Sequence, residues 1–285
     1  MIRIRAFCFL AIVFSVHTFA TQNETFGEDS IRICTYNIRY ASPRDGDDIW
    51  INRKESVAKF LSDFDVMGLQ EVTANQFEDL RERLPEFTSY GLGRDDGRLG
   101  GESAAVFFRR DRFVPLAQGT IWLGEDPTAV GQKSWDAAMP RTMTWMVLRD
   151  QETSGVFVFA NTHFDHVGKL ARQRSGELIA DFLSNRFDSL PTILLGDFNC
   201  LPGSPPHAAI SNAFRDVHQI KSVAPQGPDS TWCGFKEIVL GRRIDHVFIN
   251  NQLVLDSVSV LDPKTPSGRF ASDHLPVTAL VRLKK

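Results

Sequence analysis

The chain contains 285 residues, of which 42% are hydrophobic and 24% are charged, and its formal net charge is −3. This composition is normal for a globular protein. It lacks the surplus of basic residues that proteins use for extended contact with nucleic acid, so any phosphate substrate is expected to be bound locally or with the help of a metal cation.

The first 20 residues have the pattern of a secretory signal peptide. Two arginines precede an apolar run over residues 6–16, and small residues stand near Ala20. The run is short for a membrane span, and an uncleaved membrane anchor is the alternative. Cleavage would remove Arg3 and Arg5 and no acid, so the net charge would fall from −3 to −5. The sequence therefore predicts a secreted or periplasmic protein.

The remainder of the chain is predicted to form a single catalytic domain. Residues 21–30 are polar and unpatterned, which predicts a flexible leader. No linker rich in Pro, Gly or Ser interrupts residues 31–285, so one large α/β domain is favoured over two small ones. Nothing in the sequence indicates an obligate protein partner, and a monomer is expected.

Three cysteines follow the predicted signal peptide: Cys34, Cys200 and Cys233. An odd number in an exported protein leaves at least one free thiol or an intermolecular bond. Cys34 lies in a strand-like run and is expected to be a small buried hydrophobe, whereas Cys200 and Cys233 are a candidate disulfide. No spacing of cysteine and histidine predicts a zinc site.

Strands and amphipathic helices alternate in the first part of the chain. Residues 31–36 form a predicted strand that ends at Asn37, and apolar residues at helical spacing predict a helix over residues 52–63. A second strand begins at residue 66 and ends at Glu71, and a second helix follows around Phe77. The middle of the chain carries β-favouring residues over three segments, 103–109, 113–122 and 142–149.

The opening pattern returns in the second half. A predicted strand that ends in polar residues covers GVFVFANTHFDH, and a long helix is expected over residues 167–186. Another strand that ends in polar residues is predicted in TILLGDFN. Two strand–helix–strand units, each followed by more strands, favour an α/β fold with two packed sheets and helices outside them. A doubly wound parallel sheet is the alternative, but no glycine-rich phosphate loop follows the first strand. Further strands are expected over residues 244–250, 254–261 and 276–283.

Seven polar residues lie at or just beyond the ends of these strands, where a rigid scaffold presents reactive groups. Each alone has an ordinary structural explanation, such as an Asx turn at Asn37, a helix-entry charge at Glu71 or a core histidine at His163. Seven such groups together are harder to explain as solvated turns. They are Asn37, Glu71, His163, Asp197, Asn199, Asp245 and His274.

Together these residue types supply what the hydrolysis of a phosphoester requires. A hard divalent cation prefers oxygen ligands, and Mg²⁺ takes one or two carboxylates together with phosphate and water. An aspartate becomes a useful base when burial raises its pKa, and the apolar strand before Asp197 provides such burial. Imidazolium and amide donors stabilise the extra negative charge on the attacked phosphoryl group.

Six ordered motifs, CTYNIRY, GLQEV, NTHFD, LLGDFN, RRIDHVF and ASDHLPV, resemble the endonuclease/exonuclease/phosphatase family. That family includes pancreatic-type DNases, apurinic endonucleases, bacterial sphingomyelinases and inositol polyphosphate phosphatases. The resemblance spans about residues 31–283. It implies a four-layered α/β sandwich of the DNase I-like type, with two packed mixed β-sheets flanked by helices, and a phosphoesterase that depends on Mg²⁺ or Mn²⁺.

The resemblance also implies the residues that hold the metal and the water. Glu71 matches the principal metal ligand, and Asn37 matches the amide that orients or joins the metal site. Asp273 is a further residue that could touch the metal. Asp197 matches the acid that positions and deprotonates water, and Asn199 resembles the amide that holds this water or a phosphate oxygen.

The phosphate-binding residues follow from the same resemblance. His274 matches the terminal histidine that binds and neutralises phosphate, and Asp245 the carboxylate that orients this histidine. His163 looks like the second phosphate-binding histidine, and Glu102 is similar to the carboxylate that supports it. One position departs from the pattern of apurinic endonucleases, because Arg39 stands where those enzymes carry an acid. Cleavage at apurinic sites is therefore less expected than a compact single-metal site.

Two further segments carry candidate substrate-binding residues. GLGRDDGRLGGES contains Arg94, and WDAAMPR contains Trp135 and Arg141. Arginine makes bidentate contacts with phosphate, and Trp135 could stack on a ring. The alternative for Arg94 is an ion pair with neighbouring aspartates in a solvated loop.

The sequence thus predicts a secreted, divalent-metal-dependent phosphoesterase that drives water onto the phosphorus of a phosphodiester or phosphomonoester. A small or flexible ester is slightly favoured over duplex DNA, because the net charge is acidic and no DNA-gripping loop is evident. A nuclease and a sphingomyelinase-like phospholipid hydrolase are the alternatives, and a non-catalytic binding protein is less expected.

Overall fold

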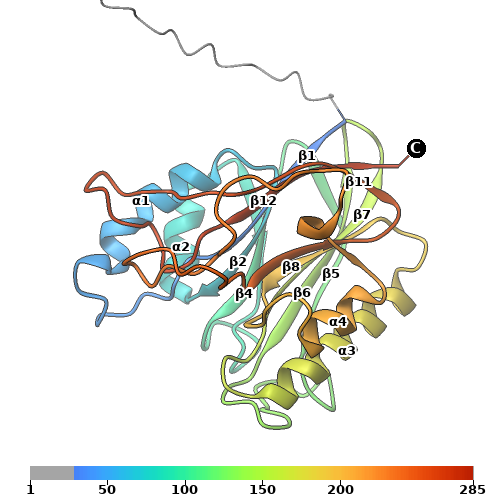
Figure 1. Cartoon of the computed structure of the whole chain (residues 1–285), viewed down its shortest axis with the longest axis horizontal. Coiled ribbons are helices and arrows are strands. Elements are labelled where there is room, and N and C mark those ends of the chain that lie inside the picture. The colour runs from blue at the N-terminus through green and yellow to red at the C-terminus, as the bar shows by residue number, and fades with distance from the viewer. Residues whose placement is uncertain (1–28, 285) are drawn as a thin grey trace, which may run out of the picture.

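The computed structural model describes residues 29–284, and its two β-sheets pack face to face with helices on their outer faces (Figure 1). The predicted four-layered α/β sandwich is confirmed. The predicted signal peptide, residues 1–20, and residues 21–28 of the predicted leader lie outside the described residues. Within residues 29–284, every helix falls short of the length and apolarity that a membrane span requires.

Both sheets are mixed. Neighbouring strands are parallel at β1–β2 and β7–β8 and antiparallel at the other pairings. The first sheet has the order β11 (Leu253–Val260), β12 (Val277–Leu283), β1 (Ile31–Asn37), β2 (Val66–Val72), β4 (Ser103–Arg109) and β3 (Phe87–Tyr90). The second has the order β5 (Phe113–Trp122), β6 (Thr142–Asp150), β7 (Val156–His163), β8 (Thr192–Asp197), β10 (Asp245–Ile249) and β9 (Arg215–Asp216).

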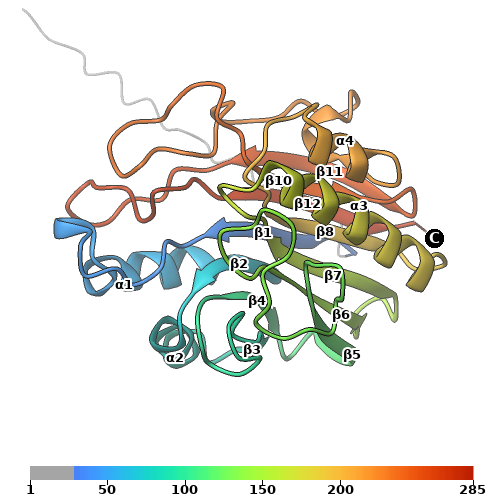
Figure 2. The ribbon, with the colours of Figure 1, turned by 90° about the horizontal axis from the view of Figure 1, so that it is seen from below.

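The helices cover the sheets in pairs (Figure 2). α1 (Trp50–Leu61) and α2 (Ala74–Arg83) pack on the first sheet, and α3 (Lys169–Arg186) and α4 (Pro205–Ser211) pack on the second. A third apolar cluster fills the space between the sheets. The central strands are therefore buried on both faces, which explains why they read as apolar runs rather than as alternating patterns. Two short 3₁₀ helices, η1 (Gly46–Asp48) and η2 (Val217–Gln219), complete the described elements.

Most predicted elements occur within a few residues of their expected bounds, and five short ones were not expected. The unpredicted elements are β3, β9, α4 and the two 3₁₀ helices η1 and η2. β9 contains two residues and β3 four, which is too short for a periodic pattern. α4 opens with two prolines, which interrupt a helical pattern in a sequence but are tolerated in the first helical turn.

The candidate disulfide between Cys200 and Cys233 is wrong, because all three described cysteines are free and buried. Cys200 packs with the helices on the outer face of the second sheet, whereas Cys233 packs in the cluster between the sheets. The two thiols therefore belong to different layers of the sandwich. Cys34 is fully buried, as expected for a small hydrophobe.

Strand register brings the polar strand ends to one edge of the sandwich. In β7 and β8, which are parallel, His163 lies opposite Asp197. In β8 and β10, which are antiparallel, Asp197 lies opposite Asp245. Asp245 therefore begins its strand at the same edge where β8 ends. In the first sheet, β1 runs parallel to β2, and Asn37 lies opposite Gln70.

A polar bridge joins the two sheets close to this edge. The Gln70 Nε2 atom donates a hydrogen bond to Asn161 Oδ1 at 2.6 Å, and Asn161 Nδ2 donates to two main-chain carbonyls of the first sheet. Gly68 makes room for the bridge, since a Cβ atom there would lie 2.2 Å from Leu195 Cδ1 and 2.7 Å from Asn161 Cγ. The sheets can approach so closely only because residue 68 has no side chain.

Candidate active site

The carboxylate of Asp197 is the centre of the candidate site. Its Oδ2 atom accepts a hydrogen bond from Asn37 Nδ2 at 3.0 Å and lies 3.4 Å from His163 Nε2 and 3.8 Å from His274 Nε2. Its Oδ1 atom accepts from the main-chain nitrogen of Asn199 at 2.9 Å. Residues from both sheets and from the segment before β12 therefore converge on one buried acid.

Asn37 and Glu71 form the part of the site that belongs to the first sheet. Asn37 Nδ2 donates to Glu71 Oε1 at 3.1 Å as well as to Asp197, so one amide joins two carboxylates. Glu71 Oε2 accepts from the Tyr40 main-chain nitrogen at 2.9 Å. Glu71 has a φ of +63°, an uncommon conformation for a residue with a side chain, and the pairing of β2 with β4 is irregular there. This irregularity turns its carboxylate toward Asn37.

His274 and Asp245 form a buried pair. His274 Nδ1 lies 2.9 Å from Asp245 Oδ2, and both residues are almost completely buried. Burial alone would lower the pKa of His274, but the charges of Asp245 and Asp197 and the hydrogen bond to Asp245 raise this pKa well above its ordinary value. His274 is therefore an imidazolium at neutral pH.

Asp197 is perturbed in the direction that suits a base. Burial and then the charge of Asp245 raise the pKa of Asp197 to about 7, although His274 and the hydrogen bonds from Asn199 and Asn37 oppose the shift. An ordinary aspartate has a pKa of about 3.9 and is a weak base. A carboxylate whose pKa lies near the working pH accepts a proton more readily and is still charged in about half of the molecules.

The second histidine differs from the first. Burial, followed by the positive charges of Arg141 and Arg94, holds the pKa of His163 well below its ordinary value. His163 is therefore a neutral imidazole, with Nε2 at 3.2 Å from Asn199 Nδ2. The site thus combines one cationic histidine with one neutral histidine, because His274 faces two carboxylates and His163 faces two guanidinium groups.

The two arginines lie beside His163. Glu71, Arg94, Arg141 and His163 line the same small cavity of about 10 Å³. Several of their donors have no hydrogen-bond partner although they are buried: Arg94 Nε, Arg141 Nε and Arg141 Nη1. Buried donors normally have partners, so these groups are the donors of this corner that remain free to contact a ligand.

Glu102 lies in this corner but does not support His163 as expected. Its carboxylate forms an ion pair with Arg94 at 2.8 Å, and no hydrogen bond joins it to His163 among the described residues. The reason is local, because the Arg94 main-chain nitrogen donates to the Glu102 carbonyl oxygen and holds the two residues side by side. Arg94 Nε also lies 3.9 Å from Asp95 Oδ1, so the alternative ion pair with a neighbouring aspartate is present, but Arg94 is buried rather than solvated.

Trp135 forms none of the hydrogen bonds or ring contacts of the site. It has a φ of +55° in the loop before β6, and the next residue, Asp136, accepts hydrogen bonds from the main-chain nitrogens of Leu170 and Ala171 in the first turn of α3. The WDAAMPR segment therefore serves to anchor α3 through Asp136, and its contribution to the site comes from Arg141.

A second buried cluster lies behind the site. His207 Nε2 is 2.9 Å from Asp216 Oδ2, and Arg243 Nη1 donates to the same oxygen at 2.9 Å and lies 3.0 Å from His246 Nδ1. Burial alone would raise the pKa of Asp216. The hydrogen bonds from His207 and His246 and the charge of Arg243 outweigh burial and hold this pKa well below its usual range. The arginine already supplies the cation, so this cluster is no metal site. His246 Nε2 lies 2.9 Å from the Cys200 main-chain oxygen, which steadies the segment after Asn199.

The chain matches known proteins both in its sequence and in its fold. A model of the endonuclease/exonuclease/phosphatase family matches residues 34–274. The chain belongs to this family. Members of the endonuclease/exonuclease/phosphatase family are hydrolases that act on phosphoesters and generally depend on a divalent metal. A comparison with curated proteins gives no match.

Several solved structures resemble this family member over nearly their whole length. An endonuclease/exonuclease/phosphatase from Bacteroides vulgatus is 36% identical, with a TM-score of 0.85, and the match covers 90% of this chain and 99% of that one. A mannosyl-6-phosphatase from Bacteroides thetaiotaomicron is 32% identical, with a TM-score of 0.81 and coverage of 88% and 99%. The catalytic domain of human Nocturnin with a bound sulfate anion, at 21% identity, a TM-score of 0.69 and coverage of 90% and 94%, shares the fold.

The donor set fits the divalent cation that members of the family generally use. Glu71, Asp197, Asp245 and Asp273 bring four carboxylates to one region, and Asn37 adds an amide oxygen. Burial and then the charge of Glu71, opposed by His274, raise the pKa of Asp273, so these acids repel one another. The Oδ1 atom of Asp245 is buried and has no hydrogen-bond partner. A hard cation held by Glu71 and Asp273 would relieve the repulsion between these acids.

Sequence reasoning missed several residues that position the site. Gln70 and Asn161 form the bridge between the sheets. Asp165 accepts hydrogen bonds from the main-chain nitrogens of Ala138 and Gly168 and lies 3.6 Å from Arg141 Nε, so it orders the loops around that arginine. Asn161 and Asp165 both stand in the stretch around the NTHFD motif, and their polar character on a buried strand or at its end was the available clue.

Proposed function

We propose that this protein is a divalent-metal-dependent phosphomonoesterase that acts on a small phosphate ester by attack of water on phosphorus. The observation that carries the proposal is the position of Asp197, whose Oδ2 atom lies 3.4 Å from His163 and 3.8 Å from His274. A base for water and two imidazoles that can contact a phosphoryl group therefore lie within the breadth of one phosphate.

In this mechanism each residue has one task. Asp197 accepts the proton of the attacking water, for which its raised pKa is suited. His274, held as a cation by Asp245, stabilises the negative charge that develops on the phosphoryl oxygens. Asn199 orients the water or a phosphoryl oxygen through its amide. His163, as a neutral imidazole, can donate one hydrogen bond and accept another.

The two arginines favour a monoester over a diester. The phosphate of a monoester carries a charge of about −1.5 to −2 at neutral pH, as a phosphorylated side chain does. Arg94 and Arg141 offer buried, unpaired donors next to His163, where such extra charge could be neutralised. The similarity to a mannosyl-6-phosphatase supports the same choice. A nuclease or a phospholipid hydrolase is the second candidate, and a diester substrate in the assay below would favour it.

A divalent cation would be held by Glu71 with Asn37 and Asp273, which offer oxygen donors. When bound, it would supply Lewis-acid polarisation of the phosphoryl group. Arg39 pairs with Asp45 at 3.0 Å and lies 3.9 Å from Asp273. Because this arginine stands where apurinic endonucleases carry an acid, a single ion is proposed. Mg²⁺ or Mn²⁺ is the proposed ion because both prefer oxygen ligands.

The test is turnover of p-nitrophenyl phosphate and bis-p-nitrophenyl phosphate with Mg²⁺, with Mn²⁺ and with EDTA, by wild type and by Asp197→Asn. We expect metal-dependent hydrolysis of the monoester and a loss of about three orders of magnitude in the variant. Asp181→Asn, the same change at an exposed position of α3, is the matched control and should keep full activity. Near-normal turnover by Asp197→Asn would refute the assignment of the base.

The location and oligomeric state are part of the proposal. The pattern of residues 1–20 supports export to the periplasm or the medium. Fractionation of cells that express the full chain, with N-terminal sequencing of the product, should find a protein that begins near residue 21. A monomer is proposed, and light scattering of the purified protein tests it.

A further inference from the structure

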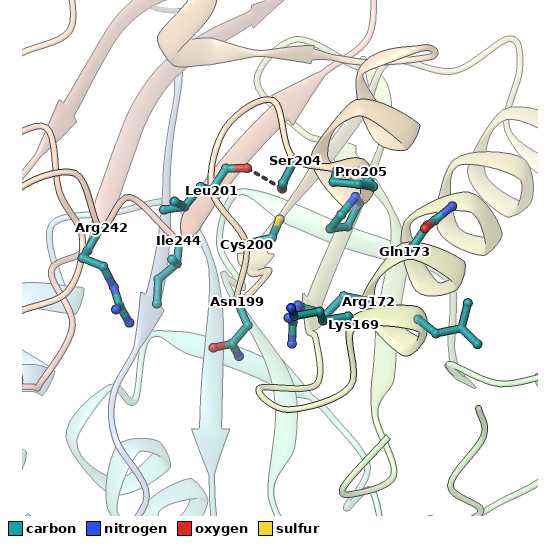
Figure 3. A pocket seen from close by; sticks show the side chains of 12 residues that line it. Lys169, Arg172, Gln173, Asn199, Cys200, Leu201, Ser204, Pro205, Arg242 and Ile244 are labelled. Carbon is teal, nitrogen blue, oxygen red and sulfur yellow. Dashed lines mark hydrogen bonds between the residues drawn. The ribbon is translucent and has the colours of Figure 1, made fainter. Parts of the chain in front are cut away.

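A cavity of about 580 Å³ opens next to the candidate active site, between α3 and the segment that joins β8 to α4 (Figure 3). Its floor is buried and apolar and includes Cys200, Pro206 and Ile244. The Ser204 hydroxyl, which also lines the cavity, donates to the Leu201 main-chain oxygen. A volume of this size lies within the range of about 300–1,000 Å³ that is typical of small-molecule sites.

Three cationic side chains surround this cavity. Lys169 and Arg172 come from the first turn of α3, and Arg242 comes from the loop before β10, on the opposite side of Asn199 (Figure 3). No carboxylate lines the cavity, and none of the three forms an ion pair among residues 29–284. Arg172 donates to the Asp165 main-chain oxygen at 2.8 Å, and the Arg242 guanidinium lies over the ring of Trp232.

The cavity is continuous with the residues proposed to bind phosphate. Asn199 lines it, and the same side chain lies 3.2 Å from His163 Nε2. The main-chain nitrogen of Asn199 donates to Asp197. A phosphoryl group held by these residues would therefore have its esterified alcohol at the mouth of the cavity. Asn199 has a φ of +47°, a conformation that turns the chain sharply between the acid and the cavity.

We propose that this cavity binds the alcohol part of the substrate and selects an alcohol that carries a second anionic group, a carboxylate or a second phosphate, on an aliphatic skeleton. The inference rests on the proposed function. The second charge is indicated by the three cations without carboxylate partners, since a negative group completes their charge balance. The aliphatic skeleton is indicated by the lining, which contains no aromatic side chain on which a nucleobase could stack.

The experiment compares esters that differ only in the second charge. Sorbitol 6-phosphate and 6-phosphogluconate have the same open six-carbon chain, but the second ends in a carboxylate. Fructose 6-phosphate and fructose 1,6-bisphosphate form the matching pair for a second phosphate. We expect wild type to hydrolyse the doubly anionic member of at least one pair with a kcat/KM roughly tenfold higher.

The variants locate this preference. In Lys169→Gln/Arg242→Gln the ratio of the two kcat/KM values within each pair should fall toward one. Lys59→Gln removes an exposed cation from α1, on the far side of the molecule, and should leave the ratio unchanged. A wild-type ratio near one in both pairs, or a ratio that the double variant keeps, would overturn the inference.

Failure of the proposed function gives a different result. If none of the four esters is hydrolysed, the proposed phosphomonoesterase activity is wrong. The same ratios are then measured as dissociation constants by calorimetry on Asp197→Asn, which needs no turnover. A preference for the doubly anionic compound that disappears when Lys169 and Arg242 are also replaced supports the inference, and equal affinities reject it.

Discussion

Replacement of Asp245 by Asn tests whether the buried pair with His274 acts as one unit. Asp245 Oδ2 lies 2.9 Å from His274 Nδ1, and its charge raises the pKa of His274 most strongly among the charges around it. An asparagine keeps the shape and one polar contact but removes the charge. The pKa of His274 would then fall, because burial would be opposed mainly by Asp197, and the histidine would place less positive charge beside the phosphoryl group.

The expected loss is large. Removal of one preorganised donor to a developing anion lowers kcat by about 10²–10³-fold, and we expect Asp245→Asn to fall in this range with p-nitrophenyl phosphate. His274→Asn should give a loss of similar size. Because the aspartate acts through the histidine, the double variant should lose little more than either single variant.

The assay is kcat and KM for the two single variants and the double variant at pH 7, with thermal unfolding as a control for folding. Removal of one partner from a buried ion pair destabilises proteins by about 3–5 kcal/mol, so each variant must be shown to be folded at the assay temperature. Losses that multiply in the double variant would show that Asp245 and His274 act independently, and the unit would not exist. Asp181→Asn again serves as the matched control.

Three further predictions follow from other parts of the structure. Burial, followed by the charge of Arg243, lowers the pKa of His218 to about 4. As the pH drops, this histidine takes up its proton in the unfolded chain before it does so in the folded protein. The free energy of unfolding therefore falls between about pH 6.5 and pH 4. This decrease, about 3 kcal/mol at most, should be smaller in His218→Gln, as measured by urea unfolding at several pH values. Gly68→Ala should destabilise the protein by about 1–3 kcal/mol, seen as a lower Tm, because its Cβ would lie 2.2 Å from Leu195 Cδ1. Arg141→Ala should raise KM for p-nitrophenyl phosphate roughly tenfold or more while the protein stays folded, and an unchanged KM would remove Arg141 from phosphate binding.

The strand ends could be predicted because they depend on local patterns. Each apolar run ends at a polar residue that neither strand formation nor packing requires, as at Asn37 and Asp197. Parallel strands then bring such ends to one edge, and the register of His163 with Asp197 shows this directly. The polar strand ends that the sequence predicts, such as His163 and Asp197, therefore meet at this edge.

Other features of the site depend on contacts between distant residues, and no local pattern predicts them. The protonation states of His163 and His274 differ because one faces arginines and the other faces aspartates, although both histidines follow similar short motifs. Glu102 binds Arg94 because a backbone hydrogen bond places the two side by side. The cationic cavity combines α3 with the loop before β10, which are far apart in the sequence.

The position of one sheet relative to the other sets the geometry of the site. Asn37 and Glu71 belong to the first sheet and Asp197 to the second, so the 3.0 Å contact between Asn37 and Asp197 requires the sheets to be fixed to within a fraction of that distance. Apolar packing alone tolerates small shifts, because dispersion contacts have no preferred direction. The hydrogen bond from Gln70 to Asn161 and the two from Asn161 to the main chain of the first sheet are directional and buried, and Gln70 directly precedes Glu71. The polar bridge therefore fixes the distance across which the acid, the amide and the metal-binding carboxylate must work together.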